Sequence, residues 1–208
     1  MKFAVKAWGN GKARTGFLQL VHCASAMETP ALLLSTRKGL PNFSSPDLLP
    51  SLPSPDSHLL QFSPLHLGIC HRKGRLLAMD VERVIMEGSS FDIWASLADE
   101  VPSWVSDKRN KTSVDRTVKW LDECITMNST GGAVFGAIVG GNDVEERQRC
   151  AAEVVKRYVS GYWIGGFGLG ESTDERPALL DAITDVLPEE MPRMICGLGL
   201  PDITLIII

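Results

Sequence analysis

The sequence contains no run of about 18 apolar residues, so it predicts no helix that spans a membrane. It has no Cys-x-x-Cys pair, and its five cysteines form an odd, scattered set. This pattern favours reduced thiols in a cytosolic protein over a disulfide framework or a zinc site. The N-terminus lacks the apolar segment of a secretory signal. With 44% hydrophobic and 22% charged residues among 208, the composition excludes a disordered or collagen-like chain and allows one sizeable core or two small ones.

Charge and proline are both unevenly distributed. Residues 1–80 carry nine Lys/Arg against four Asp/Glu, whereas residues 81–208 carry 12 against 21. No dense basic run accompanies the first excess, so a solvated surface is favoured over contact with an anionic polymer. Six of the 12 prolines lie within residues 41–64, and proline removes a donor and fixes φ. We therefore expect an irregular, extended segment there, within an irregular or β-containing N-terminal part at 1–80.

From residue 91 onward, apolar runs alternate with amphipathic segments. Strands are expected at 91–97, 133–139, 161–164 and 194–199. Helices are expected from a cap at Thr112 or Ser113 to 127, at 144–159 after a turn and cap at 140–143, at 176–187, and from Pro201 onward. This alternation predicts βαβ units and a parallel sheet over 91–208.

The sequence ends on the aliphatic run 205–208, where a further helix is expected to begin. We interpret this as a truncated chain that lacks the remaining strands of its domain. An open, crescent-shaped sheet with exposed apolar faces is then expected, and with it a tendency to aggregate.

The junctions between strands and turns resemble those of the tRNA-guanine transglycosylase family. Residues 135–141 read F-G-A-I-V-G-G, where the family has G-I-V-Q-G-G, and residues 161–171 read G-Y-W-I-G-G-F-G-L-G-E, where it has G-Y-A-I-G-G-L-x-V-G-E. Further motifs in the family order lie at 13–16 (A-R-T-G), 28–30 (E-T-P), 113–120 (S-V-D-R-T-V-K-W) and 192–201 (P-R-M-I-C-G-L-G-L-P). The resemblance implies an α/β fold, a partial TIM (β/α)₈ barrel over 1–208 with an irregular Pro-rich N-terminal region.

Departures from the family pattern indicate its accessory branch. The D-S-G-G-F-Q motif of catalytic members is absent, and Val139 stands in place of the glutamine that reads the base. The aspartate of the family's M-A-F-D-E segment maps to Ala98, or to Asp99 after a shift of one residue. Residues 141–147 (G-N-D-V-E-E-R) resemble the accessory G-G-D-V-M-E-E-R. The resemblance implies a subunit that is not catalytic and supports exchange of guanine for queuine at the tRNA wobble position.

Five residues are equivalent to the family's base pocket: Asp99, Val139, Gly140, Gly165 and Gly166. Replacing glutamine by valine leaves polar groups of the base unpaired, at roughly 1–3 kcal/mol each, which argues against the usual pocket. Asp99 is interpreted as an exposed acid that leads a helix, with a displaced pocket residue as the alternative. Gly165 and Gly166 either offer N–H groups to a ligand or simply end the strand in a tight loop.

Other conspicuous residues are interpreted structurally. Tyr162 and Trp163 are expected in the core. His58, His66, His71 and Cys70 fit no metal template, and Arg72, Lys73 and Arg75 are interpreted as solvated surface. Glu145, Glu146, Arg147 and Arg149 are expected to form pairs on a wet helix face.

The resemblance also implies partners: a catalytic homologue as the second subunit of a heterodimer, and tRNA. It implies a cytoplasmic location, with peripheral association with the mitochondrial outer membrane as an addition. The family's zinc site uses Cys-x-Cys-x-x-Cys…His ligands that this sequence does not contain, so no bound cofactor is expected here. Two alternatives remain: a diverged but active transglycosylase, and an unrelated βα-barrel enzyme that holds a phosphorylated ligand on its glycine loops.

Overall fold

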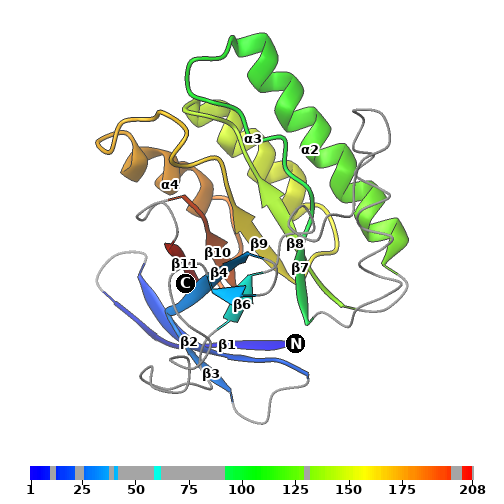
Figure 1. The fold of residues 1–208 in the computed structure, drawn as a ribbon, viewed down its shortest axis with the longest axis vertical. Coiled ribbons are helices and arrows are strands. Elements are labelled where there is room, and N and C mark those ends of the chain that lie inside the picture. The colour runs from blue at the N-terminus through cyan, green and yellow to red at the C-terminus, as the bar shows by residue number, and fades with distance from the viewer. Residues whose placement is uncertain are drawn as a thin grey trace.

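The computed structural model describes residues 1–9, 13–21, 26–37, 40–41, 59–61, 92–128, 132–197 and 203–207. It is a mixed α/β fold in which a curled parallel sheet forms half of a barrel (Figure 1). Three helices, α2, α3 and α4, cover one side of this sheet. A separate three-stranded sheet lies below it in the same view. The expected open α/β half-barrel is therefore present.

The parallel part of the sheet follows the order of the sequence. Its strands are β7 (Ile93–Ala95), β8 (Ala133–Ile138), β9 (Gly161–Ile164) and β10 (Arg193–Ile195). All four lie within the strands expected from the sequence, apart from Arg193 at the start of β10. The full sheet runs β5-β4-β11-β10-β9-β8-β7, where β5 is Leu40–Pro41, β4 is Ala31–Arg37 and β11 is Ile203–Ile207. Strand β6 (Leu59–Gln61) pairs with β4.

The helices cover Asp107–Met127 (α2), Val144–Val155 (α3) and Arg176–Thr184 (α4). The expected start of α2 is wrong, because Ser106 is its cap, six or seven residues before Thr112 or Ser113. Those two hydroxyls instead donate to helix carbonyls one turn back. The cap expected at 140–143 is confirmed, since Asp143 accepts the N–H groups of Glu145 and Glu146. No helix in the described ranges is long and apolar enough to cross a membrane.

The helix expected after Pro201 is also wrong where the structure describes it. Residues Ile203–Ile207 form strand β11, which pairs antiparallel with β10 on one side and with β4 (Ala31–Arg37) on the other. Four of these residues are isoleucine or threonine, and β-branched residues favour strands over helices. The parallel half-barrel therefore continues through an antiparallel strand.

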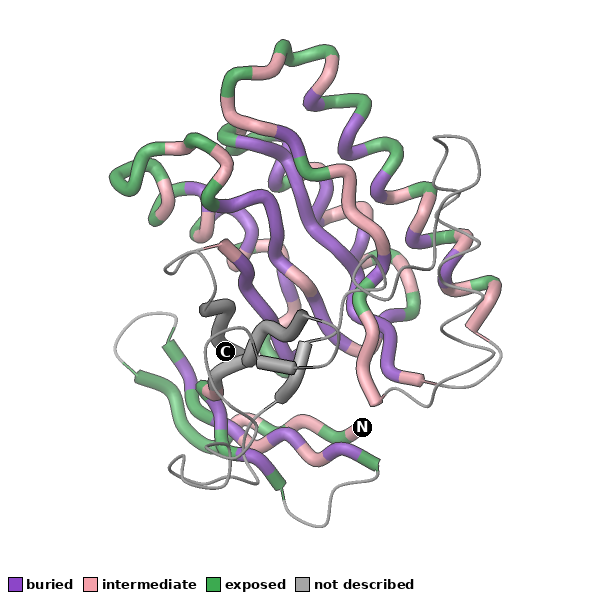
Figure 2. Tube along the Cα trace, viewed as in Figure 1, coloured by how far each residue is buried: buried purple, intermediate pink, exposed green. Residues whose placement is uncertain are grey.

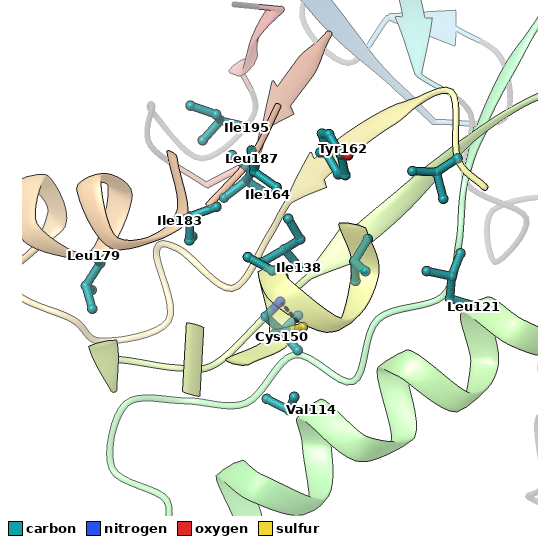
Figure 3. Packing of buried hydrophobic residues seen from close by; sticks show 14 of the residues in the cluster. Val114, Leu121, Ile138, Cys150, Tyr162, Ile164, Leu179, Ile183, Leu187 and Ile195 are labelled. Carbon is teal, nitrogen blue, oxygen red and sulfur yellow. Dashed lines mark hydrogen bonds between the residues drawn. The ribbon is translucent and has the colours of Figure 1, made fainter. Parts of the chain in front are cut away.

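Strand β8 is buried along its whole length, as its continuous apolar run predicts. Alternate residues face opposite sides of the sheet. Val134 and Ile138 join the large cluster beneath α2, α3 and α4, whereas Phe135 belongs to a smaller cluster on the other face. Figure 2 shows this buried layer running between the helices and the lower sheet, and Figure 3 shows the large cluster from close by.

The lower sheet consists of β1 (Lys2–Trp8), β2 (Arg14–Gln19) and β3 (Met27–Thr29), all antiparallel. Burial alternates along β2 and β3, so each presents one face to the protein interior. Leu18 and Met27 from that face join the cluster of Phe135. Strand β5 (Leu40–Pro41) ends at the first residue of the Pro-rich segment 41–64, and β6 (Leu59–Gln61) lies within that segment. The rest of the segment lies outside the described residues.

Candidate functional site

Three loops leave the carboxyl ends of neighbouring parallel strands. They are residues 96–106 after β7, 139–143 after β8 and 165–175 after β9, and we call them together the carboxyl edge. In βα-barrel enzymes the active site is built from such loops. The residues that the resemblance assigns to a base pocket, Asp99, Val139, Gly140, Gly165 and Gly166, all lie on this edge, so the fold brings them to one end of the sheet.

A buried arginine joins two of these loops. Arg147, in the first turn and a half of α3, is 0% exposed. Its Nε donates to the carbonyl oxygen of Gly141 at 2.6 Å, and its two terminal nitrogens donate to the carbonyls of Gly165 at 3.1 Å and Gly166 at 2.9 Å. The expectation that Arg147 lies on a wet helix face is wrong. Glu146 is also buried, although the expected i,i+3 pair is confirmed between Glu146 and Arg149 at 2.7 Å.

The guanidinium of Arg147 keeps its charge inside the protein. It lies 4.1 Å from the centre of the Phe167 ring, where a cation is attracted to the ring face. Burial lowers the pKa of Arg147 to about 10, partly opposed by the negative charges of Glu171 and Glu100. The group is therefore a cation at neutral pH, and three carbonyl oxygens satisfy it in place of water.

The turn after β8 is held from a second side by α2. Asn110, buried in the first turn of α2, donates from Nδ2 to the carbonyl oxygen of Gly140 at 2.8 Å. Gly141 adopts φ +59°, and a Cβ there would lie 3.2 Å from Oδ1 of Asn110. Both conditions favour glycine. The turn expected at 140–143 is thus fixed by side chains from two helices.

Asp99 is neither exposed nor at the start of a helix, so that interpretation is wrong. Its side chain is 11% exposed, and it lies in the loop before α2. Both nitrogens of the Arg109 fork donate to its two oxygens at 2.9 and 2.7 Å, and Arg116 donates at 2.7 Å. The alternative role of Asp99 as a displaced pocket residue stays a prediction, and in this arrangement two arginines engage the carboxylate.

The acid that faces the glycine turn is the next residue, Glu100. Its Oε1 accepts the N–H of Gly166, and a Cβ added to Gly165 would lie 2.6 Å from the same oxygen. Two glycines in sequence therefore let a carboxylate lie directly against the backbone. Sequence reasoning passed over Glu100. The sequence offered one signal, which is that two acidic residues, 99 and 100, follow an expected strand at the carboxyl end where barrel sites lie.

Val139 lies at the end of β8 and is 1% exposed. It belongs to the large apolar cluster, and its N–H donates to Sγ of Cys150 on α3 at 3.4 Å (dashed in Figure 3). Burial raises the pKa of the Cys150 thiol to about 11, so this sulfur is a neutral thiol at physiological pH. The position equivalent to the base-reading glutamine is thus filled by a side chain packed into the core.

A second carboxylate holds the far end of the loop after β9. Oxygens of Glu171 accept the N–H groups of Gly168 at 2.7 Å and Leu169 at 3.0 Å, and Nε of Arg176 donates at 2.8 Å. Burial by itself favours the protonated form of Glu171, but these hydrogen bonds outweigh it and hold its pKa below the ordinary value. A carboxylate of the glycine-rich loop therefore binds the backbone of that same loop.

The aromatic residues behind the edge are structural, as expected. Tyr162 is buried in the large cluster, and burial raises the pKa of its phenol. Trp163 is partly buried against the smaller cluster, and its Nε1 donates to Sγ of Cys196 at 2.6 Å. Cys124, Cys150 and Cys196 are buried cysteines.

Among the residues that the structure describes, no group of three His, Cys, Asp or Glu side chains is placed to hold a metal ion. The described part therefore does not fit the family's zinc. The expectations for His58, His66, His71 and Cys70, and for the basic residues Arg72, Lys73 and Arg75, fall outside the described residues.

The fold and the carboxyl edge define a protein of the βα-barrel class. Comparison with protein families then gives the particular family: the model described as queuine tRNA-ribosyltransferase matches residues 70–208. The chain belongs to this family, which confirms the resemblance drawn from its strand-turn junctions.

The individual relatives carry two different names. Queuine tRNA-ribosyltransferase accessory subunit 2 of Gallus gallus is 38% identical over 132 residues, 60% of this chain and 30% of that protein. Its namesake in Xenopus tropicalis is 43% identical over 106 residues, 49% of this chain and 25% of that protein. Queuine tRNA-ribosyltransferase of Thermus thermophilus is 32% identical over 136 residues, 64% of this chain and 35% of that protein. The chain thus spans about a third or less of the length of these relatives.

Proposed function

We propose that this chain belongs to the accessory branch of its family, as a subunit that is not itself catalytic. In this proposal it pairs with a catalytic homologue, and the heterodimer exchanges guanine for queuine at the wobble position of tRNA. The names and identities of the Gallus and Xenopus relatives support the assignment to this branch.

The observation that carries the proposal is the environment of Val139. A side chain that reads a heterocycle must offer donors or acceptors to an open pocket, because unpaired polar groups of the base cost roughly 1–3 kcal/mol each. Val139 offers neither and packs into the apolar cluster. The neighbouring donor, the Gly166 N–H, is bound to Glu100. Both observations support a carboxyl edge that does not read a base, as the proposed accessory role requires.

A diverged but active transglycosylase is the second candidate. Two observations favour it: the 32% identity to the Thermus enzyme, and a carboxylate, Glu100, on the edge where such chemistry takes place. The two candidates differ in what one chain does alone. An active enzyme exchanges base without a partner, whereas an accessory subunit does so only with one.

The proposal keeps the cytoplasm as the location, with peripheral association with the mitochondrial outer membrane as an addition that cell fractionation tests. No step of the proposal passes through zinc, because the described residues offer no ligand set for it.

The test combines co-purification with base exchange. This chain is co-expressed with a catalytic homologue, and incorporation of labelled guanine into tRNA is measured for the pair, for each chain alone and for a boiled control. We expect the two chains to co-purify, and we expect this chain alone to give no incorporation above the boiled control. Incorporation by this chain alone would favour the second candidate.

A repair variant sharpens the test. Val139→Gln returns one base-reading amide, but places it in an apolar cluster and supplies no nucleophile. We therefore expect no turnover from this variant and a lower stability of the chain. Turnover by Val139→Gln would show that the roles of these residues are wrongly assigned.

A further inference from the structure

Within residues 166–169 of the glycine-rich loop, three backbone N–H groups donate to carboxylates. Gly166 donates to Glu100, whereas Gly168 and Leu169 donate to Glu171. Successive backbone N–H groups in a loop form a concavity that binds anions. We call the donors of residues 166–169 the cradle; one of them binds Glu100 and two bind Glu171.

The direction of the Gly166 N–H is fixed from behind. In a trans peptide the N–H and the preceding C=O point in opposite directions. The carbonyl of Gly165 is held toward Arg147, so the N–H of Gly166 points away from Arg147 and toward Glu100. Gly166 has φ +71°, a conformation that side chains rarely adopt. Arg147 therefore positions this donor toward the side from which Glu100 approaches.

The two occupants of the cradle are held differently. Glu171 belongs to the loop itself, has a side chain that is 3% exposed and binds Arg176 as well. Glu100 comes from the preceding loop and is an exposed residue whose Oε1 rests against the bare backbone of Gly165 and Gly166. An exposed carboxylate that reaches in from another loop can leave without unfolding the loop it contacts.

We propose that Glu100 is a displaceable internal occupant of this cradle, and that its departure opens the Gly166 N–H to a small oxyanion such as phosphate. The buried positive charge of Arg147 favours an anion at this position, whether it is the Glu100 carboxylate or a ligand. Because the space is shaped by a carboxylate against two glycines, a planar or tetrahedral oxyanion suits it better than a bulky group. The inference goes beyond the proposed function and does not depend on which protein pairs with the chain.

The test follows one amide by NMR in the full chain. Labelling with [1-¹³C]glycine and [¹⁵N]glycine together leaves carbonyl-filtered signals only from glycines that follow glycine, namely Gly132, Gly141 and Gly166. Glu100→Ala is expected to move the Gly166 signal and leave Gly132 in place. Inorganic phosphate is then expected to shift Gly166 saturably, with an affinity about tenfold higher than in the unchanged chain, the worth of one charge-assisted hydrogen bond.

Two further variants keep the result interpretable. Glu145→Ala removes one exposed acid from the neighbouring turn and is expected to bind phosphate no better than the unchanged chain. Glu100→Gln keeps an acceptor oxygen without the charge, and its side chain is expected to stay bound to the Gly166 N–H, so that phosphate gains no affinity. A trinucleotide RNA tested beside free phosphate distinguishes a backbone phosphodiester from the free ion as the source of the oxyanion.

The outcomes are decisive because the signals of Gly132 and Gly141 report whether each variant is folded. If Glu100→Ala leaves the Gly166 signal unchanged, Glu100 is not its partner and the proposal is overturned. It is equally overturned if neither phosphate nor the trinucleotide shifts Gly166 in Glu100→Ala, or if Glu145→Ala gains the same affinity. None of these results bears on the exchange assay with a catalytic homologue, so the two proposals fail separately.

Discussion

Arginines on α3 and just after its end meet different surroundings on two sides of the helix. On the carboxyl edge, Arg147 is fully buried and bound to three carbonyl oxygens. On the outer surface between α2 and α3, Arg149 pairs with Asp115 at 2.7 Å and Arg157 pairs with Asp122 at 2.7 Å, with both aspartates more than half exposed. We call this second region the outer seam.

The difference teaches how little the count of ion pairs says about stability. Exposed pairs contribute roughly 0–1 kcal/mol because water and salt screen them. A buried guanidinium cannot form hydrogen bonds with water, so losing its protein partners costs much more free energy than losing an exposed pair. On the carboxyl edge a fully buried arginine is bound by backbone carbonyl oxygens, whereas on the outer seam arginines pair with aspartates that stay in contact with water.

The largest effect is expected from the pair of variants Arg147→Met and Arg157→Met. Arg147→Met leaves three carbonyl oxygens without their donors. Charge-assisted hydrogen bonds are worth roughly 1.5–3 kcal/mol each, and relief of the buried charge offsets part of the loss, so we expect unfolding free energy to fall by about 3 kcal/mol or more. Arg157→Met is expected to cost about 1 kcal/mol or less, because the side chains of its partners Asp122 and Glu153 are 54% and 36% exposed. Urea unfolding followed by circular dichroism measures both, and equal losses would remove the distinction between the two regions.

The sequence predicts the parallel half-barrel because strands buried on both faces leave long apolar runs. The bounds of β9 coincide with the expectation, and β8 differs by one residue at its end. The start of α2 was missed because Thr112 and Ser113 look like caps, although inside a helix such hydroxyls can also bond back to a carbonyl. Residues 203–207 were missed because Pro201 was interpreted as the first turn of a helix. Their β-branched residues already favoured a strand, and pairing with β4 and β10 fixes it.

The role of Arg147 was hidden by its residue type. Its position was visible in principle, because 147 stands at i, i+3, i+4 and i+7 spacing with the buried residues 150, 151 and 154. An arginine in an apolar stripe indicates either that the stripe is interrupted by a solvent-exposed residue or that the arginine is buried as a cation. The glycine pairs at 140–141 and 165–166 supply the carbonyl oxygens that a buried cation needs. The choice between Asp99 and Glu100 was not available from sequence, since it depends on where Arg109 and Arg116 lie.

The next effect in size tests packing behind the edge. A Cβ added to Gly161 would lie 2.4 Å from Cε1 of Phe135, on the inner face of the sheet. Overpacking of this kind costs about 1–3 kcal/mol, so we expect that loss from Gly161→Ala. Gly9→Ala, whose Cβ meets only ordinary contacts near 3.4 Å, is the control and is expected to change stability by less than about 0.5 kcal/mol. Equal thermal midpoints of the two variants would contradict the tight packing of β8 on β9.

A smaller effect separates the caps of two helices. Asp143 accepts two N–H groups at 2.9 and 3.1 Å, whereas Ser106 accepts one at 3.4 Å. We expect Asp143→Ala to cost about 1 kcal/mol and Ser106→Ala about half of that. Chemical denaturation of both variants checks the order. A larger loss for Ser106→Ala would mean that the cap of α2, and not the turn at 140–143, limits the stability of this edge.

The smallest effect concerns acid, and it contrasts one carboxylate from each region. Hydrogen bonds hold the pKa of Glu171 below its ordinary value against the opposing effect of burial, and hydrogen bonds from Lys156 and Arg157 do the same for Glu153 on the outer seam. A pKa lowered in the folded state contributes stability that is complete above the unfolded value, near 4.3, and is lost as pH falls through the folded value. Both Glu171→Gln and Glu153→Gln therefore flatten the acid limb of the stability curve at low salt.

Salt separates the two carboxylates. Two of the groups that bind Glu171 are backbone N–H donors of its own loop, and its side chain is nearly buried, so about 1 M salt leaves its contribution in place. The contribution of Glu153 comes from the ammonium of Lys156 and the guanidinium of Arg157, which are screened. Acid titration of unfolding at low and high salt measures this: Glu171→Gln is expected to differ from the unchanged chain at both, Glu153→Gln only at low salt. The same salt dependence in both variants would show that the carboxyl edge is as open to solvent as the outer seam.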